Sequence, residues 1–191
     1  MMIKDRYSPK ASEILDVAET HMRKGGFDAV SFRDLAGAVG VKSASVHYHF
    51  PQKADLGQAV VARYRARIFE SLGDADDVSG TPVERLERLL TIYRTALTDA
   101  DSVCLCNMLG AEARYLPDDV AVEVDAFFKG VLAWTEKALS SNTKRPDITG
   151  WASYLLSSLQ GAMVLSVATN NYDHYHNTEK LIRQTVDAAF I

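Results

Sequence analysis

The stretch SFRDLAGAVGVKSASVHYHF, residues 31–50, constrains the fold of this 191-residue chain more than any other. Ser31 is followed three residues later by Asp34, the spacing of a capping box, so we expect a helix to begin there. Gly40 follows the apolar positions of this helix, and glycine most readily takes the positive φ of a sharp helix end. A second short helix is expected over residues 43–49. The pattern predicts two short helices joined by a tight turn.

The outer face of the second short helix carries hydrogen-bonding and aromatic side chains and no carboxylate, which suits insertion into a polyanionic groove. The distribution of charge along the chain also favours a polyanionic partner. Up to residue 72 there are eleven lysines and arginines against eight aspartates and glutamates, and beyond it ten against seventeen, although the net charge is −4. The basic N-terminal part, which we call the head, is suited to contact with phosphates, and the acidic remainder is not. The residues on this face are Lys42, Ser43, Ser45, His47, Tyr48 and His49.

The segment DLAGAVGVKSASVHYHFPQKADL, especially its HFPQK portion ending at Lys53, resembles the DNA-binding signature of the TetR/AcrR family of bacterial transcriptional regulators. The resemblance covers roughly the first third of the chain closely, and the rest only in helix pattern and length. It implies a helix-turn-helix followed by a longer helix that begins at Lys53. Position 47 departs from the family pattern, because histidine stands where tyrosine is more frequent. The alternative is an ordinary helical hairpin, which is disfavoured because the cap, the glycine turn and the HF-P-x-K ending coincide.

From the resemblance and the polar face together, we expect contacts with double-stranded operator DNA. Residues 43–49 are expected in the major groove, with Ser31 and Lys53 on phosphates. The expected DNA-binding residues are Ser31, Arg33, Lys42, Ser43, Ala44, Ser45, His47, Tyr48, His49 and Lys53.

The remaining pattern predicts an all-α chain of about nine helices, since no stretch has a convincing strand pattern. A glycine-bounded acidic stretch, residues 73–80, marks the expected domain boundary. We therefore expect a helix-turn-helix domain over 1–52, a connecting helix over 53–72, and a ligand-binding and dimerisation domain over 73–191. The other helices are expected at about 8–24, 81–98, 102–115, 117–139, 147–169 and 178–189, with a loop over 140–146.

The eighth expected helix, about 147–169, is apolar or small nearly all round, whereas a surface helix of a monomer has one polar face. Small residues four apart allow a partner helix to approach closely, and the family resemblance implies a homodimer built on this helix and the next. Burial within one subunit is the alternative. The helix is also apolar enough to test as a membrane span, but serines interrupt it, so a buried helix is favoured and no membrane is expected. The expected interface residues are Trp151, Leu155, Ser157, Gly161 and Leu165.

Two cysteines in one short segment, Cys104 and Cys106, make no disulfide framework, and a reducing cytoplasm is expected. Cys104 is expected in the first turn of a helix, where a thiolate is favoured and could sense oxidants or electrophiles. Two small buried hydrophobic side chains are the favoured interpretation. His174 and His176 with Asp173 suggest a metal, but they lack a fourth ligand, so a polar loop is favoured and neither a metal nor a cofactor is expected.

The sequence therefore predicts a ligand-responsive DNA-binding regulator, most simply a homodimeric repressor that an unknown small-molecule effector releases from a palindromic operator. A regulator that senses oxidants or electrophiles through Cys104 is the alternative within this class. A small all-α enzyme that depends on cysteine or a metal is the alternative from another class, although no glycine-rich phosphate loop or nucleophile elbow supports it. The expected effector-binding residues are Tyr93, Cys104, Met108, Phe127, Trp134 and Met163.

Overall fold

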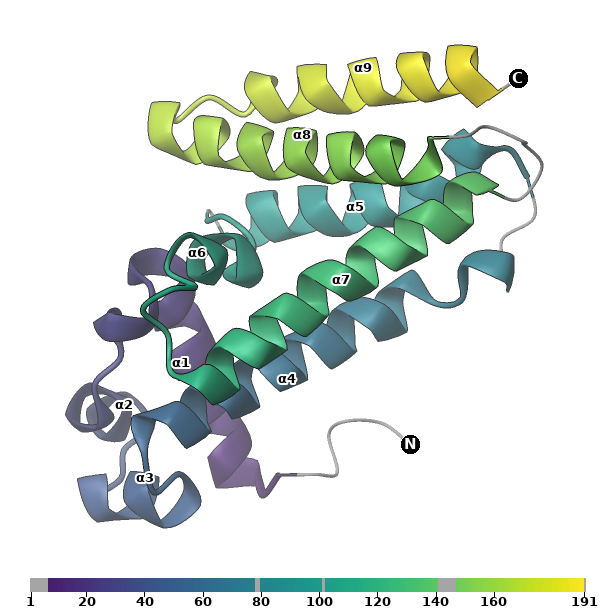
Figure 1. The fold of residues 1–191 in the computed structure, drawn as a ribbon. Helices are drawn as coiled ribbons and strands as arrows, with labels where there is room; N and C mark the ends of the chain where they lie inside the picture. The colour runs from purple at the N-terminus through teal and green to yellow at the C-terminus, as the bar shows by residue number, and fades with distance from the viewer. Residues whose placement is uncertain (1–6, 78–79, 101, 141–146, 191) are drawn as a thin grey trace. The chain divides into compact units, whose positions relative to one another are not determined.

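The computed structural model describes residues 7–77, 80–100, 102–140 and 147–190, and within these ranges the chain is helical and contains no strand (Figure 1). The predicted all-α class is confirmed. Contacts divide the chain into two compact units. The first unit holds the residues up to Ile68 together with Leu105–Phe127, and the second holds Phe69–Cys104 together with the residues from Phe128 onward.

The first unit begins with helix α1 (Pro9–Gly25), whose two ends follow from local sequence. The Ser8 hydroxyl accepts a hydrogen bond from the backbone N–H of Ala11 at 3.2 Å, and Pro9 occupies the first turn, where its missing N–H is not needed. Gly26 ends the helix at φ +78°, a value that side chains rarely permit. The unit continues with η2 (Phe27–Ala29), α2 (Phe32–Ala38), α3 (Ser43–His49), α4 (Lys53–Leu72), α6 (Leu105–Ala111) and the first part of α7 (Asp118–Ser140).

The second unit contains η3 (Ala75–Asp77), α5 (Pro82–Ala100), the rest of α7, α8 (Ile148–Thr169) and α9 (Asp173–Phe190). Helices α8 and α9 run side by side (Figure 1), and α9 also packs against α5. Asp147 caps α8 by accepting from the N–H of Gly150 at 3.1 Å, and Asn170 ends it in the left-handed conformation. Among helices of the described residues, α8 alone is long and apolar enough to cross a membrane, a test that a core helix also passes.

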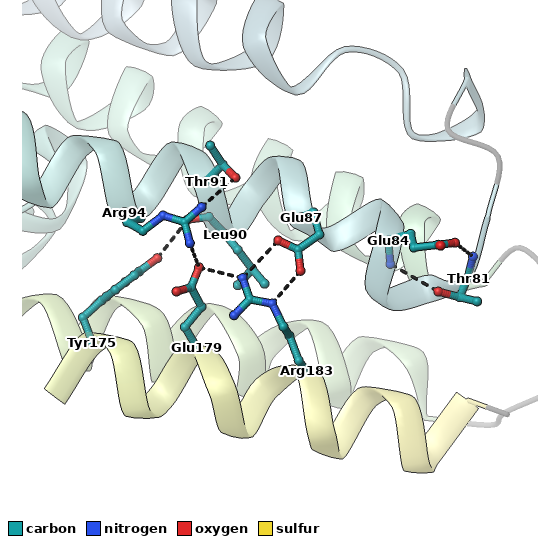
Figure 2. A network of polar contacts seen from close by, with 9 residues as sticks. All are labelled: Thr81, Glu84, Glu87, Leu90, Thr91, Arg94, Tyr175, Glu179 and Arg183. Atoms are coloured by element: carbon teal, nitrogen blue, oxygen red, sulfur yellow. Dashed lines mark hydrogen bonds and ion pairs between the residues drawn. The ribbon is translucent and has the colours of Figure 1, made fainter. Parts of the chain in front are cut away.

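A polar network joins α5 to α9 (Figure 2). Glu179 of α9 is 3% exposed and accepts from Arg94 of α5 at 2.9 Å and from Arg183 of its own helix at 3.0 Å. Arg183 also donates to both carboxylate oxygens of Glu87. One turn away, the buried Tyr175 hydroxyl donates to the carbonyl of Leu90 at 3.1 Å. Burial of Glu179 is tolerable because two guanidinium groups satisfy its charge.

The Glu87–Arg183 pair makes stability depend on pH. The hydrogen bond from Arg183 lowers the pKa of Glu87 below its ordinary value of 4.5. A carboxyl whose pKa is depressed by folding stabilises the fold above its unfolded pKa, and this contribution disappears as the pH falls through the folded value. We expect the urea midpoint of the wild type to fall more steeply below pH 4.5 than that of Arg183→Met. Parallel acid dependences for the two proteins would contradict this assignment.

Helix α6 is shorter than predicted, because it spans Leu105–Ala111 rather than 102–115. After it the chain turns through tighter bonds, such as Glu112 N–H to the Leu109 carbonyl at 3.1 Å, and the α-helical pattern stops. Cys104 therefore directly precedes the helix, and its expected place in the first turn was wrong. Both Cys104 and Cys106 are free and buried, at 1% and 0% exposed.

Helix α9 begins earlier than predicted, at Asp173 rather than near residue 178. The side chain of Asn171 accepts from the N–H of Asp173 at 2.9 Å, which opens the helix, and the buried Tyr175 anchors its first turn. The expected polar loop is wrong, since His174 and His176 are exposed helical residues. Among the described residues no group of three histidine, cysteine or acidic side chains could hold a metal ion. Most of the loop predicted over 140–146 lies outside the described residues.

Candidate nucleic-acid interface

The two short helices of the first unit form around the predicted cap and turn. The Ser31 hydroxyl accepts from the backbone N–H of Asp34 at 3.3 Å and so satisfies a free donor at the start of α2. Gly40 takes φ +68°, and the next N–H, that of Val41, donates to the carbonyl of Ala36 at 2.9 Å. This closes the sharp turn between α2 and α3, so the expected helix–turn–helix arrangement is present.

Helix α3 has one buried and one outer face. Val46 is 0% exposed and the following Phe50 is 4% exposed, so these two side chains anchor the helix in the head. On the outer side Tyr48 is 83% exposed, an unusual position for a large aromatic ring without a partner surface. The predicted residues that are exposed are Arg33, Lys42, Ser43, Ala44, His47 and Tyr48, and those that are half-buried are Ser31, Ser45, His49 and Lys53.

His47 is held by two neighbours. Its Nδ1 lies 3.3 Å from the carbonyl oxygen of Pro51, and because a carbonyl only accepts, Nδ1 must donate. The ring also meets Phe32 edge-on, with centroids 4.6 Å apart. Nε2 is therefore the acceptor of the neutral ring, and it can donate to a phosphate only when the imidazole is protonated.

Lys53 stands at the first residue of α4 and is held by the η2 turn. Its ammonium nitrogen lies 3.0 Å from Oδ1 of Asp28 and 4.7 Å from the centroid of the Phe27 ring. The Phe27 ring is itself buried, at 8% exposed. The lysine is thus placed by a carboxylate and an aromatic face of the same unit.

The arginines of α4 face carboxylates of the first unit. Arg63 pairs with Asp16 at 2.7 Å and Arg65 with Glu123 at 2.9 Å. Arg67 pairs in the same way with Glu19 of α1, at 2.7 Å. These pairs hold the three guanidinium groups against carboxylates of their own unit.

Comparison with known proteins agrees with this arrangement. Residues 14–60 match the family model of bacterial regulatory proteins of the tetR family. Over the whole chain, the crystal structure of a TetR transcriptional regulator from Legionella pneumophila superposes with a TM-score of 0.87, at 28% identity, covering 94% of this chain and 98% of that one. The chain belongs to the TetR family.

Another TetR-family relative is the HTH-type transcriptional repressor KstR2 of Mycobacterium tuberculosis, 28% identical over 80 residues. That match covers 42% of this chain and only 40% of the relative's length. The structure of AibR in complex with isovaleryl coenzyme A and operator DNA shares the fold with a TM-score of 0.66, at 21% identity, covering 81% of this chain and 85% of that one.

Asp28 and Phe27, the two residues that hold Lys53, were not among the predicted site residues. They are about 25 positions from it in the chain, and no helical periodicity links them. The sequence contains one weak signal for this turn, because the pair Gly25 and Gly26 directly before Phe27 is typical of turns.

The expected effector-binding residues belong to both units, and none of them lines the surface pocket described for residues 147–154. Tyr93, Cys104, Trp134 and Met163 belong to the second unit, and Met108 and Phe127 to the first. In the second unit the Tyr93 hydroxyl accepts from Gln160 at 2.8 Å, and Trp134 donates to the carbonyl of Gly73 at 2.9 Å. A shallow surface pocket of about 280 Å³ is lined instead by Asp147, Gly150, Trp151 and Tyr154, at the start of α8.

The expected interface residues of α8 fall on two sides of the helix. Leu155 is 1% exposed and packs within its own unit, and Trp151 is half-buried with its ring against Phe190. Ser157, Gly161 and Leu165 are exposed, the last at 53%. Other large apolar side chains that are exposed on α8 and α9 are Tyr154, Val164, Val167 and Leu181.

Proposed function

We propose that this chain is a ligand-responsive transcriptional regulator, a homodimeric cytoplasmic repressor that leaves a palindromic operator when it binds a small molecule. The observation that carries the proposal is the outer face of α3, exposed and without a carboxylate, on a capped helix–turn–helix. Family membership supports a regulator rather than an enzyme. KstR2 is a repressor by name, and AibR has been captured with both an acyl coenzyme A and operator DNA.

On this proposal, α3 enters the major groove and its neighbours hold the DNA backbone. Ser45 and Tyr48 would meet base edges, while Ser31 and Lys53 would meet phosphates. The exposure of Tyr48 supports this role, because it needs no rearrangement to reach a groove. Two heads related by a two-fold axis would then select half-sites one or more helical turns apart.

The exposed apolar side of α8 and α9 supports the dimer. A monomeric surface rarely leaves several large apolar side chains on adjacent helices, and Leu165 and Leu181 are more than half exposed there. Gly161, at the centre of this side of α8, has no atom within 4 Å of an added Cβ, so a partner helix can approach its backbone. The proposed interface is therefore Ser157, Gly161 and Leu165 with Trp151 at its edge, and Leu155 supports the helix from inside.

For the effector, we retain a small molecule bound in the ligand-binding domain. Such a ligand must favour the state that cannot bind DNA, and linkage then requires DNA to weaken effector binding by the same factor. The thiol alternative loses support because Cys104 and Cys106 are buried, whereas sensor cysteines are accessible.

Lys53→Ala and Tyr48→Ala are the test of the docking arrangement. We expect Lys53→Ala to weaken binding to every duplex alike and to reduce the slope of log affinity against log salt by about one, because a phosphate contact carries no sequence information. Tyr48→Ala should change affinity by different factors for different sequences. The measurement is selection of bound duplexes from a random pool, followed by salt titrations on the best sequence.

Glu136→Ala on α7 of the second unit is the control, and it should change neither quantity. The docking arrangement is wrong if both head variants retain wild-type affinity, slope and sequence preference. A wild-type protein that retains no duplex at all would refute the regulator itself.

A further inference from the structure

The η2 turn places a negative charge beside the lysine that the proposed function assigns to a phosphate. Asp28 lies on this turn with a side chain that is 99% exposed, and its Oδ1 is 3.0 Å from the ammonium of Lys53. The Lys53 side chain is 33% exposed, since part of it rests against the Phe27 ring. The ammonium has three N–H donors and can meet both groups, but the carboxylate offsets part of the charge that it offers to a phosphate.

The turn itself is held firmly. The backbone N–H of Phe27 donates to Oε2 of Glu112 at 2.9 Å, so the segment after α6 fixes the start of η2. Gly26 faces the same carboxylate, and an added Cβ there would collide with it. Asp28 therefore lies beside Lys53 on an ordered turn.

We propose that Asp28 is an internal competitor of the DNA backbone, an exposed counterion that offsets part of the Lys53 charge and so weakens its bond to a phosphate. This inference rests on the proposed function and adds a residue that lowers the affinity of the head for any duplex. A highly exposed ion pair is weak, so the competition is worth a small factor per head and leaves binding possible. In a dimer with both heads on one operator, the affinity would be lowered by this factor for each head.

The first experiment measures Asp28→Asn against wild type on a fluorescein-labelled duplex of mixed sequence at low salt, by anisotropy. We expect affinity to rise about two- to fivefold per head, and the gain to shrink as salt is added, because exposed charge pairs are screened. Asp34→Asn removes the same charge from α2 and is the matched control, expected to change affinity less. Asp28 is fully exposed, so the thermal midpoint should stay at the wild-type value.

The decisive comparison repeats Asp28→Asn in a Lys53→Ala background. If Asp28 acts by holding Lys53, its substitution has no effect once the lysine is gone, and the double-mutant cycle shows coupling. An equal gain in both backgrounds would mean that Asp28 merely repels DNA, and no gain in either would mean that it does not compete; both results overturn the proposal. These results leave the regulator standing, whereas a wild type that fails to bind duplex DNA at any salt overturns both.

Discussion

Gly161→Leu is expected to produce a folded monomer whose affinity for a palindromic operator is lower by about 100-fold or more, since one head can no longer hold the second on its half-site. The structure allows this substitution within the chain, because an added Cβ at Gly161 has no atom within 4 Å. Gly161 is also exposed on the surface of α8, so we attribute a large effect to the partner subunit. Sedimentation velocity gives the oligomeric state, and operator titration gives the affinity.

Ala133→Leu is the matched control for added bulk, because Ala133 is an exposed position of α7 in the same unit and lies outside the proposed interface. It should remain dimeric with wild-type operator affinity. The far-UV spectrum of Gly161→Leu should also remain that of a folded helical protein. Sedimentation of the wild type as a monomer at micromolar concentration would remove the basis of the dimer.

Glu179→Ala is expected to lower the free energy of unfolding by about 2–4 kcal/mol, because removing a buried carboxylate leaves two guanidinium groups without it and opens a space between α5 and α9. Its side chain is 4% exposed and accepts from both Arg94 and Arg183. Urea unfolding followed by circular dichroism measures the loss.

Glu87→Ala provides the comparison, since Glu87 pairs with the same Arg183 but has a side chain that is 40% exposed. An exposed pair contributes about 0–1 kcal/mol, so this variant should lose far less stability. Similar losses for the two glutamates would show that burial does not set the strength of this network.

The helix–turn–helix could be predicted because its signals are local. The Ser31 side chain caps α2 by accepting from the backbone N–H three residues further along. Gly40 supplies the positive φ that the turn requires. The ends of α1 at Ser8 and Gly26 are local in the same way. Each of these features depends on the conformation of a few consecutive residues, so the sequence carries the whole signal.

The errors fell where a distant residue decides the outcome. Helix α6 ends early where Glu112 reaches back to the turn after α1, and α9 begins early because Tyr175 is buried against α5. Local helix propensity at both places is compatible with a longer or a shorter helix, so tertiary packing decides where α6 ends and where α9 begins.

The face of α8 shows the same division. The amino-acid pattern is enough to show that the helix is apolar nearly all round and carries small residues at regular spacing. The burial of Leu155 and the exposure of Leu165 follow from the packing of α9 against α8, which the pattern does not contain.

Lys53, at the candidate site, also depends partly on local sequence and partly on tertiary packing. Its position at the start of α4 was determined by the local sequence, directly after Pro51 and Gln52. Its pairing with Asp28 and Phe27 was decided by the fold alone, since charge and ring come together only when a turn some 25 residues earlier packs beside the helix. Electrostatic interactions act through space, and a sequence records distance only along the chain.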